Sequence, residues 1–419
     1  MATPGKPGVA GESMQTQTPE CSVIIPVFNK WELTRDCLAS LSRHSTGHDL
    51  EVIVVDNGSS DATATELEAH GKSLFGERFV ALAFAENRNF GPACNAGAGI
   101  ATSPILFFLN NDTIFTPEWF PPLLEGLHAV GQNGAVGPLL LYEDGRIQHM
   151  GVAFGIHGLS HLYSRFPVDH PVVSRKRKLQ AITGAAFMIR AESFNGCGCF
   201  YEGYKNGFED IELSVQITRR GGTLRCIPSS RIYHLESKTP GRKDAEVSNS
   251  ELFTRRCADA VYPDFHHHLL RDGFEFRISE LLTLCAKLTE KDDLALREQV
   301  QGKNAAEWFK LAQENPFWEY GRDVLAKSCE NQKRYAEAVL FRIELTNIFP
   351  CIKRYNDLLR LAPLVKDTSW QQGAEEELAL MVRFKNSPGY TRNVRRRLGF
   401  DKDSLLDEAF SATMKEWFS

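Results

Sequence analysis

The feature that most constrains the fold is a regular alternation of apolar, strand-like runs and helical stretches between Cys21 and Leu109. The run Glu51–Asp56 (EVIVVD) is apolar at four consecutive positions, which is typical of a strand that is buried on both faces. Because strands alternate with helices, this segment predicts an α/β domain with a mostly parallel sheet and right-handed crossovers. The predicted strands are Ser22–Val27, Glu51–Asp56, Phe79–Phe84 and Ile105–Leu109.

The rest of the chain divides by composition. Residues 1–20 are rich in Gly, Pro and Thr and predict a disordered tail. We expect the α/β domain to cover residues 21–250 and an all-α region to cover residues 251–419, where helix formers dominate and no clear strand stands out. Pro316 and Pro350 lie 34 residues apart, the period of tetratricopeptide repeats, but the pattern fits a plain helical bundle equally well.

Composition excludes some classes of protein. The net charge of −5 argues against a general nucleic-acid binder, so we expect no nucleic-acid partner. The ten cysteines include no CxxC pair, and residues 1–20 contain no apolar signal stretch. The uncharged span Phe90–Asn111 is interrupted by Pro92 and Pro104, so it is not a membrane helix. We therefore expect a cytoplasmic protein, with peripheral attachment to the inner membrane as the alternative.

Polar clusters follow all four predicted strands. In open α/β sheets ligands bind at the carboxyl ends of the strands, so these clusters are candidates for a binding site. Asp56, at the end of a buried strand, can accept hydrogen bonds from a base or a ribose, although a β-turn with an Asx cap is an equal alternative. The clusters are Pro26-Val27-Phe28-Asn29, Asp56-Asn57-Gly58-Ser59, Glu86-Asn87-Arg88 and Asn110-Asn111-Asp112.

Asn110 and Asp112 form a candidate site for a metal and a sugar. Residues i and i+2 of an extended segment point the same way, so both side chains can face one ligand. Asp112 offers a hard oxygen suited to Mg²⁺ or Mn²⁺, and His234 can complete the site. The alternatives are a helix cap before Pro117 and a purely structural histidine.

Glu209 and Asp210 precede a predicted helix over Ile211–Arg220. A carboxylate here can act as a general base that takes a proton from an attacking hydroxyl. The alternative is that the pair only caps the helix, because the helix dipole favours negative charge at its start.

Together these residues resemble glycosyltransferase family 2, of the GT-A fold, over about Cys21 to Thr239. The family's P-x-[YF]-N, D-[DN]-x-S and E-N-x-G-F motifs match segments that begin at Pro26, Asp56 and Glu86, with Asn89 where the family favours Gly. The resemblance implies that the donor nucleotide is bound by Pro26, Phe28, Asn29, Asp56, Asn57, Ser59, Asn87, Arg88, Asn95, Asn110 and Asn111.

The resemblance also assigns the catalytic side. The D-x-D motif aligns with Asn110-Asn111-Asp112, whose first Asp is replaced by Asn as in rhamnosyltransferase-like sequences. It implies a divalent cofactor, Mn²⁺ or Mg²⁺, held by Asp112 and His234. It makes Asp210, within the pair Glu209-Asp210, the catalytic base, and it puts Thr183, Gly184 and Ala185 on the acceptor side.

The sequence therefore predicts an inverting glycosyltransferase that moves a sugar from a UDP- or dTDP-sugar donor to a hydroxyl of a glycan, glycoprotein or lipid-linked acceptor. Bacterial polysaccharide assembly is the expected setting. The helical C-terminal region, including the basic stretch 392–397, is expected to contact a membrane surface or a protein partner, or to form an oligomer, and the sequence does not choose among these alternatives. The alternative function is a non-catalytic scaffold with a degenerate transferase domain and a helical interaction module.

Overall fold

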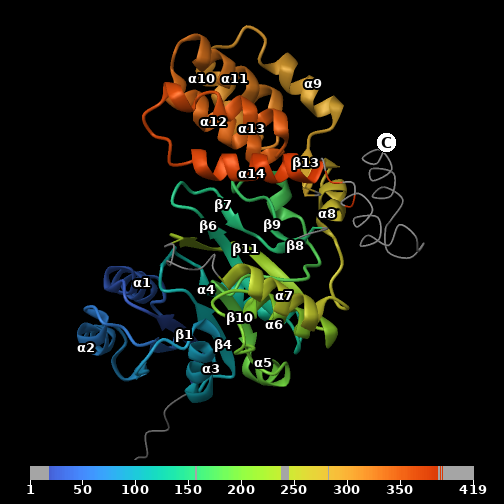
Figure 1. Ribbon diagram of the computed structural model, residues 1–419. Helices are drawn as coiled ribbons and strands as arrows, with labels where there is room; N and C mark the ends of the chain where they lie inside the picture. Colours follow the sequence, from blue (N-terminus) through green and yellow to red (C-terminus); the bar gives the residue numbers. More distant parts are fainter. Residues whose placement is uncertain are drawn as a thin grey trace, which may run out of the picture.

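The computed structural model describes residues 18–155, 158–236, 245–281, 283–385, 387 and 389. An α/β part occupies the lower half of the view in Figure 1, and a layer of helices lies above it. Apart from residues 18–20, the predicted tail over residues 1–20 lies outside the described residues, and so does the basic stretch 392–397. The division into domains stays a prediction.

One nine-stranded sheet organises the α/β part, with the strand order β3-β2-β1-β4-β10-β6-β11-β5 and β7 beside β6. The first four strands pair in parallel, as the alternating sequence pattern predicted. Beyond β4 the sheet is mixed, because β10 runs antiparallel to both β4 and β6. The strands are β1 Cys21–Val27, β2 Leu50–Asp56, β3 Phe79–Ala83, β4 Ile105–Leu109, β5 Thr113–Phe115, β6 Ala135–Leu141, β7 Ile147–His149, β10 Ala186–Arg190 and β11 Leu224–His234.

Helices cover both faces of this sheet, which explains the continuous apolar runs of β1 and β2. Alternate residues point to opposite faces, so Ile24 and Ile53 pack into one core while Val23 and Val52 pack into the other. The first core includes residues of α3 (Phe90–Ile100), α5 (Ala191–Gly196) and α6 (Glu209–Arg219). The second core includes residues of α1 (Trp31–His44), α2 (Thr63–Phe75) and α4 (Phe120–Ala129).

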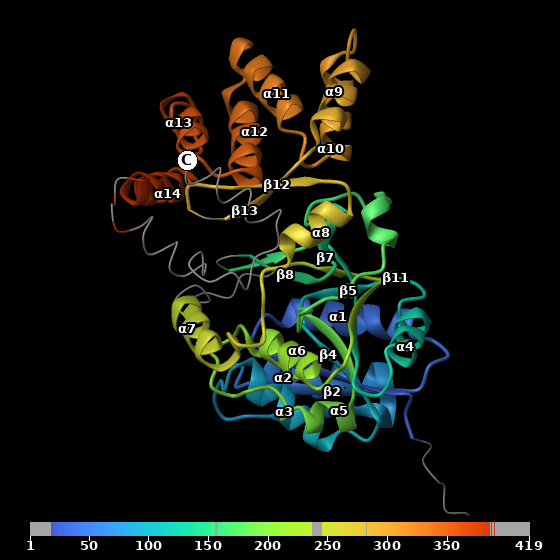
Figure 2. The same cartoon turned by 90° about the vertical axis from the view of Figure 1, so that its right-hand side faces the viewer.

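A short segment with its own hairpin follows β7. Strands β8 (Val152–Phe154) and β9 (Leu159–His161) pair antiparallel, and Val152 also bridges to Ala181. Beyond the sheet, α7 (Glu246–Cys257) packs against α6, and α8 (Phe265–Arg271) lies below the helical layer (Figure 2).

The predicted fold class, an α/β domain followed by a helical region, is confirmed with one exception. The region after residue 250 is not free of strands, because β12 (Glu275–Ile278) and β13 (Leu284–Lys287) form an antiparallel hairpin. Both strands are four residues long, so their alternation was too brief to stand out from helical patterns. The helices are α9 Glu290–Gln299, α10 Ala305–Glu314, α11 Glu319–Asn331, α12 Tyr335–Ile348, α13 Ile352–Leu359 and α14 Gln371–Lys385.

The two prolines 34 residues apart occupy equivalent positions. Pro316 lies two residues after the end of α10, and Pro350 lies two residues after the end of α12. A proline there cannot continue a helix, so each one separates one helix pair from the next. Along the chain the helices thus follow one another as the pairs α9–α10, α11–α12 and α13–α14 (Figure 2). The two helices pack closely in the second and third pairs, whereas α10 packs on α11 rather than on α9.

An aromatic cluster joins the helical region to the α/β part. The ring of Phe317, between α10 and α11, lies 4.8 Å from the ring of Phe166 and 5.2 Å from that of Phe274. Beside it, Nη1 of Arg146 donates hydrogen bonds to the backbone oxygens of Arg165 and Gln313, both at 2.9 Å. Aromatic packing of this kind, in which Phe166 is buried and Phe274 and Phe317 are partly buried, holds the two parts against each other.

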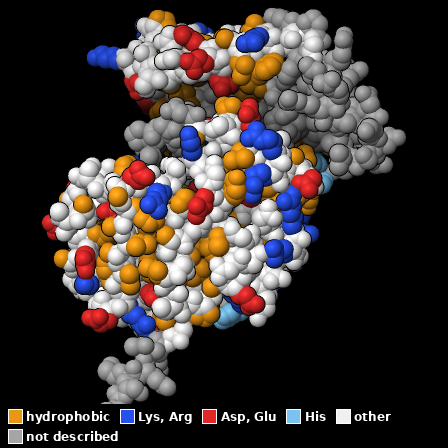
Figure 3. Space-filling model, turned by 60° about the horizontal axis from the view of Figure 1, so that its bottom comes forward, with side chains coloured by type: hydrophobic (Ala, Val, Ile, Leu, Met, Phe, Trp, Pro, Cys, Tyr) orange, Lys and Arg blue, Asp and Glu red, His pale blue; other side chains and the backbone are white. Residues whose placement is uncertain are grey.

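On the face of the molecule seen in Figure 3, charged side chains of both signs are interspersed with apolar ones. Within the described part of the chain, no helix is both long enough and apolar enough to cross a bilayer.

Candidate active site

The predicted site residues gather at one edge of the sheet. Val27, the last residue of β1, is the register partner of Asp56, the last residue of β2. The chain leaves β4 at Leu109, directly before Asn110, and β11 brings His234 opposite Thr113 of β5. The carboxyl ends of these strands therefore converge, as expected for parallel neighbours.

Asn57 ties two of the strand-end loops together. Its Nδ2 donates to Oδ1 of Asn87 at 3.1 Å and to the backbone oxygen of Asn89 at 3.0 Å, and its Oδ1 accepts from the backbone N–H of Arg88 at 2.8 Å. Gly58 has a φ of 83°, and a Cβ there would lie 2.8 Å from the backbone of Glu86. This close approach requires glycine.

Asp56 is 7% exposed, and its Oδ1 accepts a hydrogen bond from the backbone N–H of Ser59 at 2.9 Å. The Asx-type turn considered from the sequence is therefore present. On the neighbouring loop, the backbone N–H of Asn29 donates to Oγ of Ser59 at 2.8 Å, and Oδ1 of Asn29 accepts from the N–H of Ser60 at 2.8 Å. Phe28 exposes 42% of its surface beside these groups, which leaves its ring open to stacking on a base.

Two predicted donor-binding residues act as internal braces. The amide of Asn95 bonds to both the N–H and the C=O of Phe200, at 3.0 and 2.9 Å. Nδ2 of Asn111 donates to Oγ1 of Thr34 on α1 at 2.8 Å. Both side chains hold neighbouring segments in place at this edge.

Asp112 and His234 form a close, nearly buried pair. Nε2 of His234 lies 3.1 Å from Oδ1 of Asp112, and the two side chains are 12% and 7% exposed. The backbone supports the contact, because the backbone N–H of Leu235 donates to the backbone oxygen of Asp112 at 2.9 Å. Nδ2 of Asn110 lies 3.2 Å from the same imidazole nitrogen.

Gln148 orients His234, although no sequence motif pointed to this glutamine. Nε2 of Gln148 donates to the backbone oxygen of His234 at 2.8 Å, so the other end of the amide, Oε1, faces Nδ1 of the ring at 2.7 Å. An amide oxygen only accepts hydrogen bonds, so Nδ1 carries a proton. Nε2 is then directed at Asp112 and Asn110.

These residues fit a divalent cation. In the neutral form of His234 with the proton on Nδ1, the Nε2 lone pair and Oδ1 of Asp112 are two electron-pair donors 3.1 Å apart, and a shared cation would remove their repulsion. Among the residues that the structure describes, no three His, Cys, Asp or Glu side chains cluster as a metal site. A metal held by Asp112 and His234 would therefore take further ligands from Asn110 or from a bound diphosphate.

Asp210 lies at the start of α6 and is held by the predicted acceptor-side turn. Its Oδ2 accepts a hydrogen bond from the backbone N–H of Gly184 at 2.6 Å, and a Cβ on Gly184 would lie 3.0 Å from Cβ of Asp210. The next residue, Ala185, accepts through its backbone oxygen from the N–H of Asn110 at 3.0 Å. A two-residue segment thus links the Asp112 side of the site to Asp210.

His149, the neighbour of Gln148, supports the same turn. The backbone N–H of Thr183 donates to its Nε2 at 3.2 Å, so Nε2 carries no proton, and Nδ1 donates to Nδ1 of His161 at 2.7 Å. Burial holds the pKa of His149 well below its usual range, with a further contribution from His161 and His234. Strand β7 therefore braces both halves of the site, His234 through Gln148 and Thr183 through His149.

The other carboxylates around α6 have structural partners. Oε2 of Glu209 accepts from the backbone N–H of Gly207 at 2.7 Å. Glu212 pairs with Arg256 at 2.7 Å and accepts from the hydroxyl of Tyr204 at 2.7 Å. Asp210 is thus the carboxylate of this group that contacts the acceptor-side turn.

A cavity of about 350 Å³ opens beside His234. Besides His234, it is lined by Tyr142, Glu143, Asp144, Arg165, Leu235 and Glu236. The guanidinium of Arg165 lies 3.7 Å from the centre of the Tyr142 ring, which makes this wall both planar and charged.

Comparison with known proteins points to one family. Residues 22–197 match the model of glycosyl transferase family 2. The chain is 30% identical over 228 residues to the O-antigen biosynthesis protein RfbC of Myxococcus xanthus (52% of this chain and 18% of that protein), and 32% identical over 274 residues to N-acetylgalactosaminyltransferase 6 of Drosophila melanogaster (61% and 40%). A crystal structure of GalNAc-T7 with UDP, GalNAc and Mn²⁺ superimposes with a TM-score of 0.48 at 18% identity, covering 57% of this chain and 48% of that one. The chain spans less than half the length of these two sequence relatives.

Proposed function

The chain contains a glycosyl transferase family 2 domain over residues 22–197, and from that premise we propose that it transfers a sugar from a nucleotide diphosphate donor to an acceptor hydroxyl with inversion at the anomeric carbon. The proposed donors are UDP- or dTDP-sugars, and the proposed acceptor is a glycan, glycoprotein or lipid-linked sugar. Assembly of a bacterial surface polysaccharide is the proposed setting.

One observation carries the proposal. Asp112 and His234 are candidate metal ligands, and Asp210 is a candidate base. Hydrogen bonds through Gly184 and Ala185 connect Asp210 to Asn110, on the side of the site that holds the two candidate ligands. An inverting transfer needs these two groups on opposite sides of the anomeric carbon, one for the leaving diphosphate and one for the attacking hydroxyl. The family match and this arrangement support each other.

In the proposed reaction, Oδ1 or Oδ2 of Asp210 accepts the proton of the acceptor hydroxyl as its oxygen attacks the anomeric carbon. The bond between the anomeric carbon and the diphosphate breaks in the same step, and the diphosphate leaves with the bonding electron pair. Asp112 and His234, with Asn110, would hold a divalent cation, which when bound neutralises charge on the leaving diphosphate. Phe28 and Asp56 bind the base and ribose in this proposal.

The proposal is tested by titrating UDP, dTDP and GDP, with and without Mn²⁺, into the full chain and into Asp112→Ala by calorimetry. We expect metal-dependent binding of one nucleotide that is lost in Asp112→Ala. Asp210→Asn should bind the same nucleotide normally and lose transfer by roughly 10²- to 10⁴-fold, because only the proton acceptor is removed.

The opposite result would change the function. If no nucleotide binds under either condition, the catalytic proposal fails, and the scaffold alternative takes its place.

A further inference from the structure

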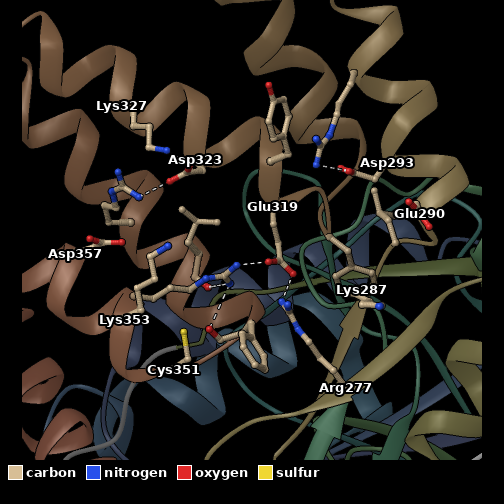
Figure 4. A pocket seen from close by; sticks show the side chains of 18 of the residues that line it. Arg277, Lys287, Glu290, Asp293, Glu319, Asp323, Lys327, Cys351, Lys353 and Asp357 are labelled. Carbon is tan, nitrogen blue, oxygen red and sulfur yellow. Dashed lines mark hydrogen bonds and ion pairs between the residues drawn. The ribbon is translucent and has the colours of Figure 1, made fainter. Parts of the chain in front are cut away.

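A large cavity lies in the helical region. It is a groove of about 730 Å³ bounded by the first helix of each pair, α9, α11 and α13, together with α12 and the β12–β13 hairpin (Figure 4). Stacked helix pairs commonly present such a surface to an extended ligand. The proposed transferase chemistry does not use this groove.

The groove is charged, with an excess of positive groups. Of the nineteen residues that line it, eight are Lys or Arg and five are Asp or Glu. The chain as a whole has the opposite balance, with a net charge of −5. Glu275 and Glu330, which are not part of the lining, pair with Lys287, Arg342 and Arg360, so the positive excess is smaller than the lining alone indicates. The excess that remains favours a ligand that carries negative charge.

The excess is concentrated where two arginines share one carboxylate. Arg277 from β12 and Arg354 from α13 both pair with Glu319 of α11. Figure 4 shows Arg277 directed at the Glu319 carboxylate. Two cations on one anion leave a positive charge at the centre of the groove. Lys353, beside Arg354, makes no ion pair with any residue that the structure describes, so it adds a second uncompensated charge.

Arg277 has one guanidinium nitrogen, Nε, without a hydrogen-bond acceptor in the described part of the chain. Its guanidinium lies 3.5 Å from the centre of the Phe349 ring, and its Nε is buried. Burial holds the pKa of Arg277 below its ordinary value, against the opposing effect of Glu319. The Arg277 side chain as a whole is still 28% exposed, so an anionic oxygen in the groove can approach the accessible part of its guanidinium.

The lining also indicates what kind of anionic molecule fits. Arginines cover the aromatic faces, Arg277 over Phe349 and Arg297 over Tyr320 at 3.8 Å, so these faces are already occupied by guanidinium groups. The lining includes no Asn, Gln, Ser or Thr, the uncharged side chains that pair with a peptide backbone. Sugar hydroxyls, in contrast, can donate to Asp and Glu while acidic substituents bind Arg and Lys.

The groove is also attached to the wall of the site. Phe317 lines the groove and packs on Phe166, and the neighbour of Phe166, Arg165, lines the cavity beside His234. A long ligand held in the groove is therefore kept near the residues proposed to transfer the sugar.

From these observations we propose that the groove around Arg277, Arg354 and Lys353 binds an acidic segment of the glycan acceptor, one that carries carboxylate or phosphate groups. This inference rests on the proposed function, because it takes the acceptor to be a glycan. The groove acts as an anchoring site away from the reacting hydroxyl.

The test is calorimetric binding of a short oligogalacturonate to the full chain, to Lys353→Glu and to Lys303→Glu. Lys353 is exposed, so its reversal leaves the packing intact, and Lys303 is an exposed lysine outside the groove lining. We expect binding that weakens with salt, falls roughly tenfold in Lys353→Glu and is unchanged in Lys303→Glu. A teichoic-type phosphate polymer in place of the uronate separates phosphate from carboxylate as the recognised group.

Equal binding by the wild-type chain and Lys353→Glu would overturn the proposal, and so would equal binding of a neutral malto-oligosaccharide of the same length. Tighter, Lys353-dependent binding of a poly-glutamate peptide would replace the glycan with an acidic peptide. Nucleotide binding measured on the same variants separates the two proposals. If only the groove is affected, Lys353→Glu binds the nucleotide as the wild-type chain does. If the wild-type chain binds no nucleotide, the proposed transferase function itself is refuted.

Discussion

Oε1 of Gln148 accepts a hydrogen bond from Nδ1 of His234 at 2.7 Å, while Nε2 of the same amide donates to the backbone oxygen of His234 at 2.8 Å. This double contact fixes both the ring orientation and the tautomer of the histidine. The nitrogen directed at Asp112 is thereby left available for a cation. A glutamine on a three-residue strand thus controls a group 86 positions further along the chain.

The first prediction concerns this contact. Gln148→Ala should raise the Mn²⁺ concentration needed for half-maximal nucleotide binding by about 10- to 100-fold, because the orienting partner of a metal-binding histidine is lost. Gln148→Glu should recover part of that loss, since a carboxylate still accepts from Nδ1. Titration of Mn²⁺ at fixed nucleotide measures both, with the exposed Gln332→Ala as control. An unchanged Mn²⁺ requirement in Gln148→Ala would show that the contact is only structural.

The second prediction concerns Asn110, which stands where the D-x-D motif has its first Asp. Asn110→Asp puts a second carboxylate next to Asp112 and His234, and hard divalent cations bind more tightly as ligand charge increases. We expect the Mn²⁺ requirement to fall several-fold and nucleotide binding in the absence of metal to weaken through like-charge repulsion. The same titration measures both effects. A higher Mn²⁺ requirement would mean that the amide of Asn110 is itself needed at the site.

The third prediction concerns the turn that holds Asp210. Gly184→Ala introduces a Cβ 3.0 Å from Cβ of Asp210, so the carboxylate must shift. The shift needed is a few tenths of an ångström. Because a displacement of about 1 Å in a reacting group can lower turnover roughly 10²-fold, this smaller one should lower it by about 10-fold or less. We expect kcat to fall by that order while nucleotide affinity is retained, measured as transfer from the donor that the titrations identify. Gly99→Ala is the matched control, because nothing lies within 4 Å of a Cβ there.

The fourth prediction concerns pH. The folded-state pKa of His149 lies well below its usual value, so between that pKa and about 6.5 the unfolded chain binds more protons than the folded one. The contribution of His149 to stability is therefore complete above about pH 7 and is lost as the pH falls below about 6.5, by up to about 1.4 kcal/mol per pH unit.

Thermal or urea unfolding between pH 5 and pH 8 checks this expectation. His149→Gln keeps an acceptor for the N–H of Thr183 but does not titrate, so the free energy of unfolding should depend less on pH in this variant. An identical pH dependence in the two proteins would contradict the assignment. His44→Gln, on the far end of α1, serves as the control histidine.

The sequence alone determined the elements on which the site is built. The consecutive apolar residues of β2 indicate burial on both faces, and together with the alternation of strands and helices they predicted the parallel pairing of β1 to β4, though not the order of the strands in the sheet. The polar residues that end these strands must then meet at one edge, which is why the segments around Asn29, Asp56 and Asp112 could be identified together. The candidate base Asp210 and the candidate metal ligand His234, which follow the strand-end segments in the chain, were recognised through family motifs, and their roles stay proposals.

Only the tertiary structure decided how the site is held. Gln148 and His149 lie on a strand too short to show a period, and their partners His234 and Thr183 are distant in the sequence. The groove in the helical region likewise depends on Arg277, Glu319 and Arg354 arriving from three separate elements. Periodicity reports which face of an element is buried, but not which polar side chains meet across elements, because that depends on the packed positions of whole helices and strands.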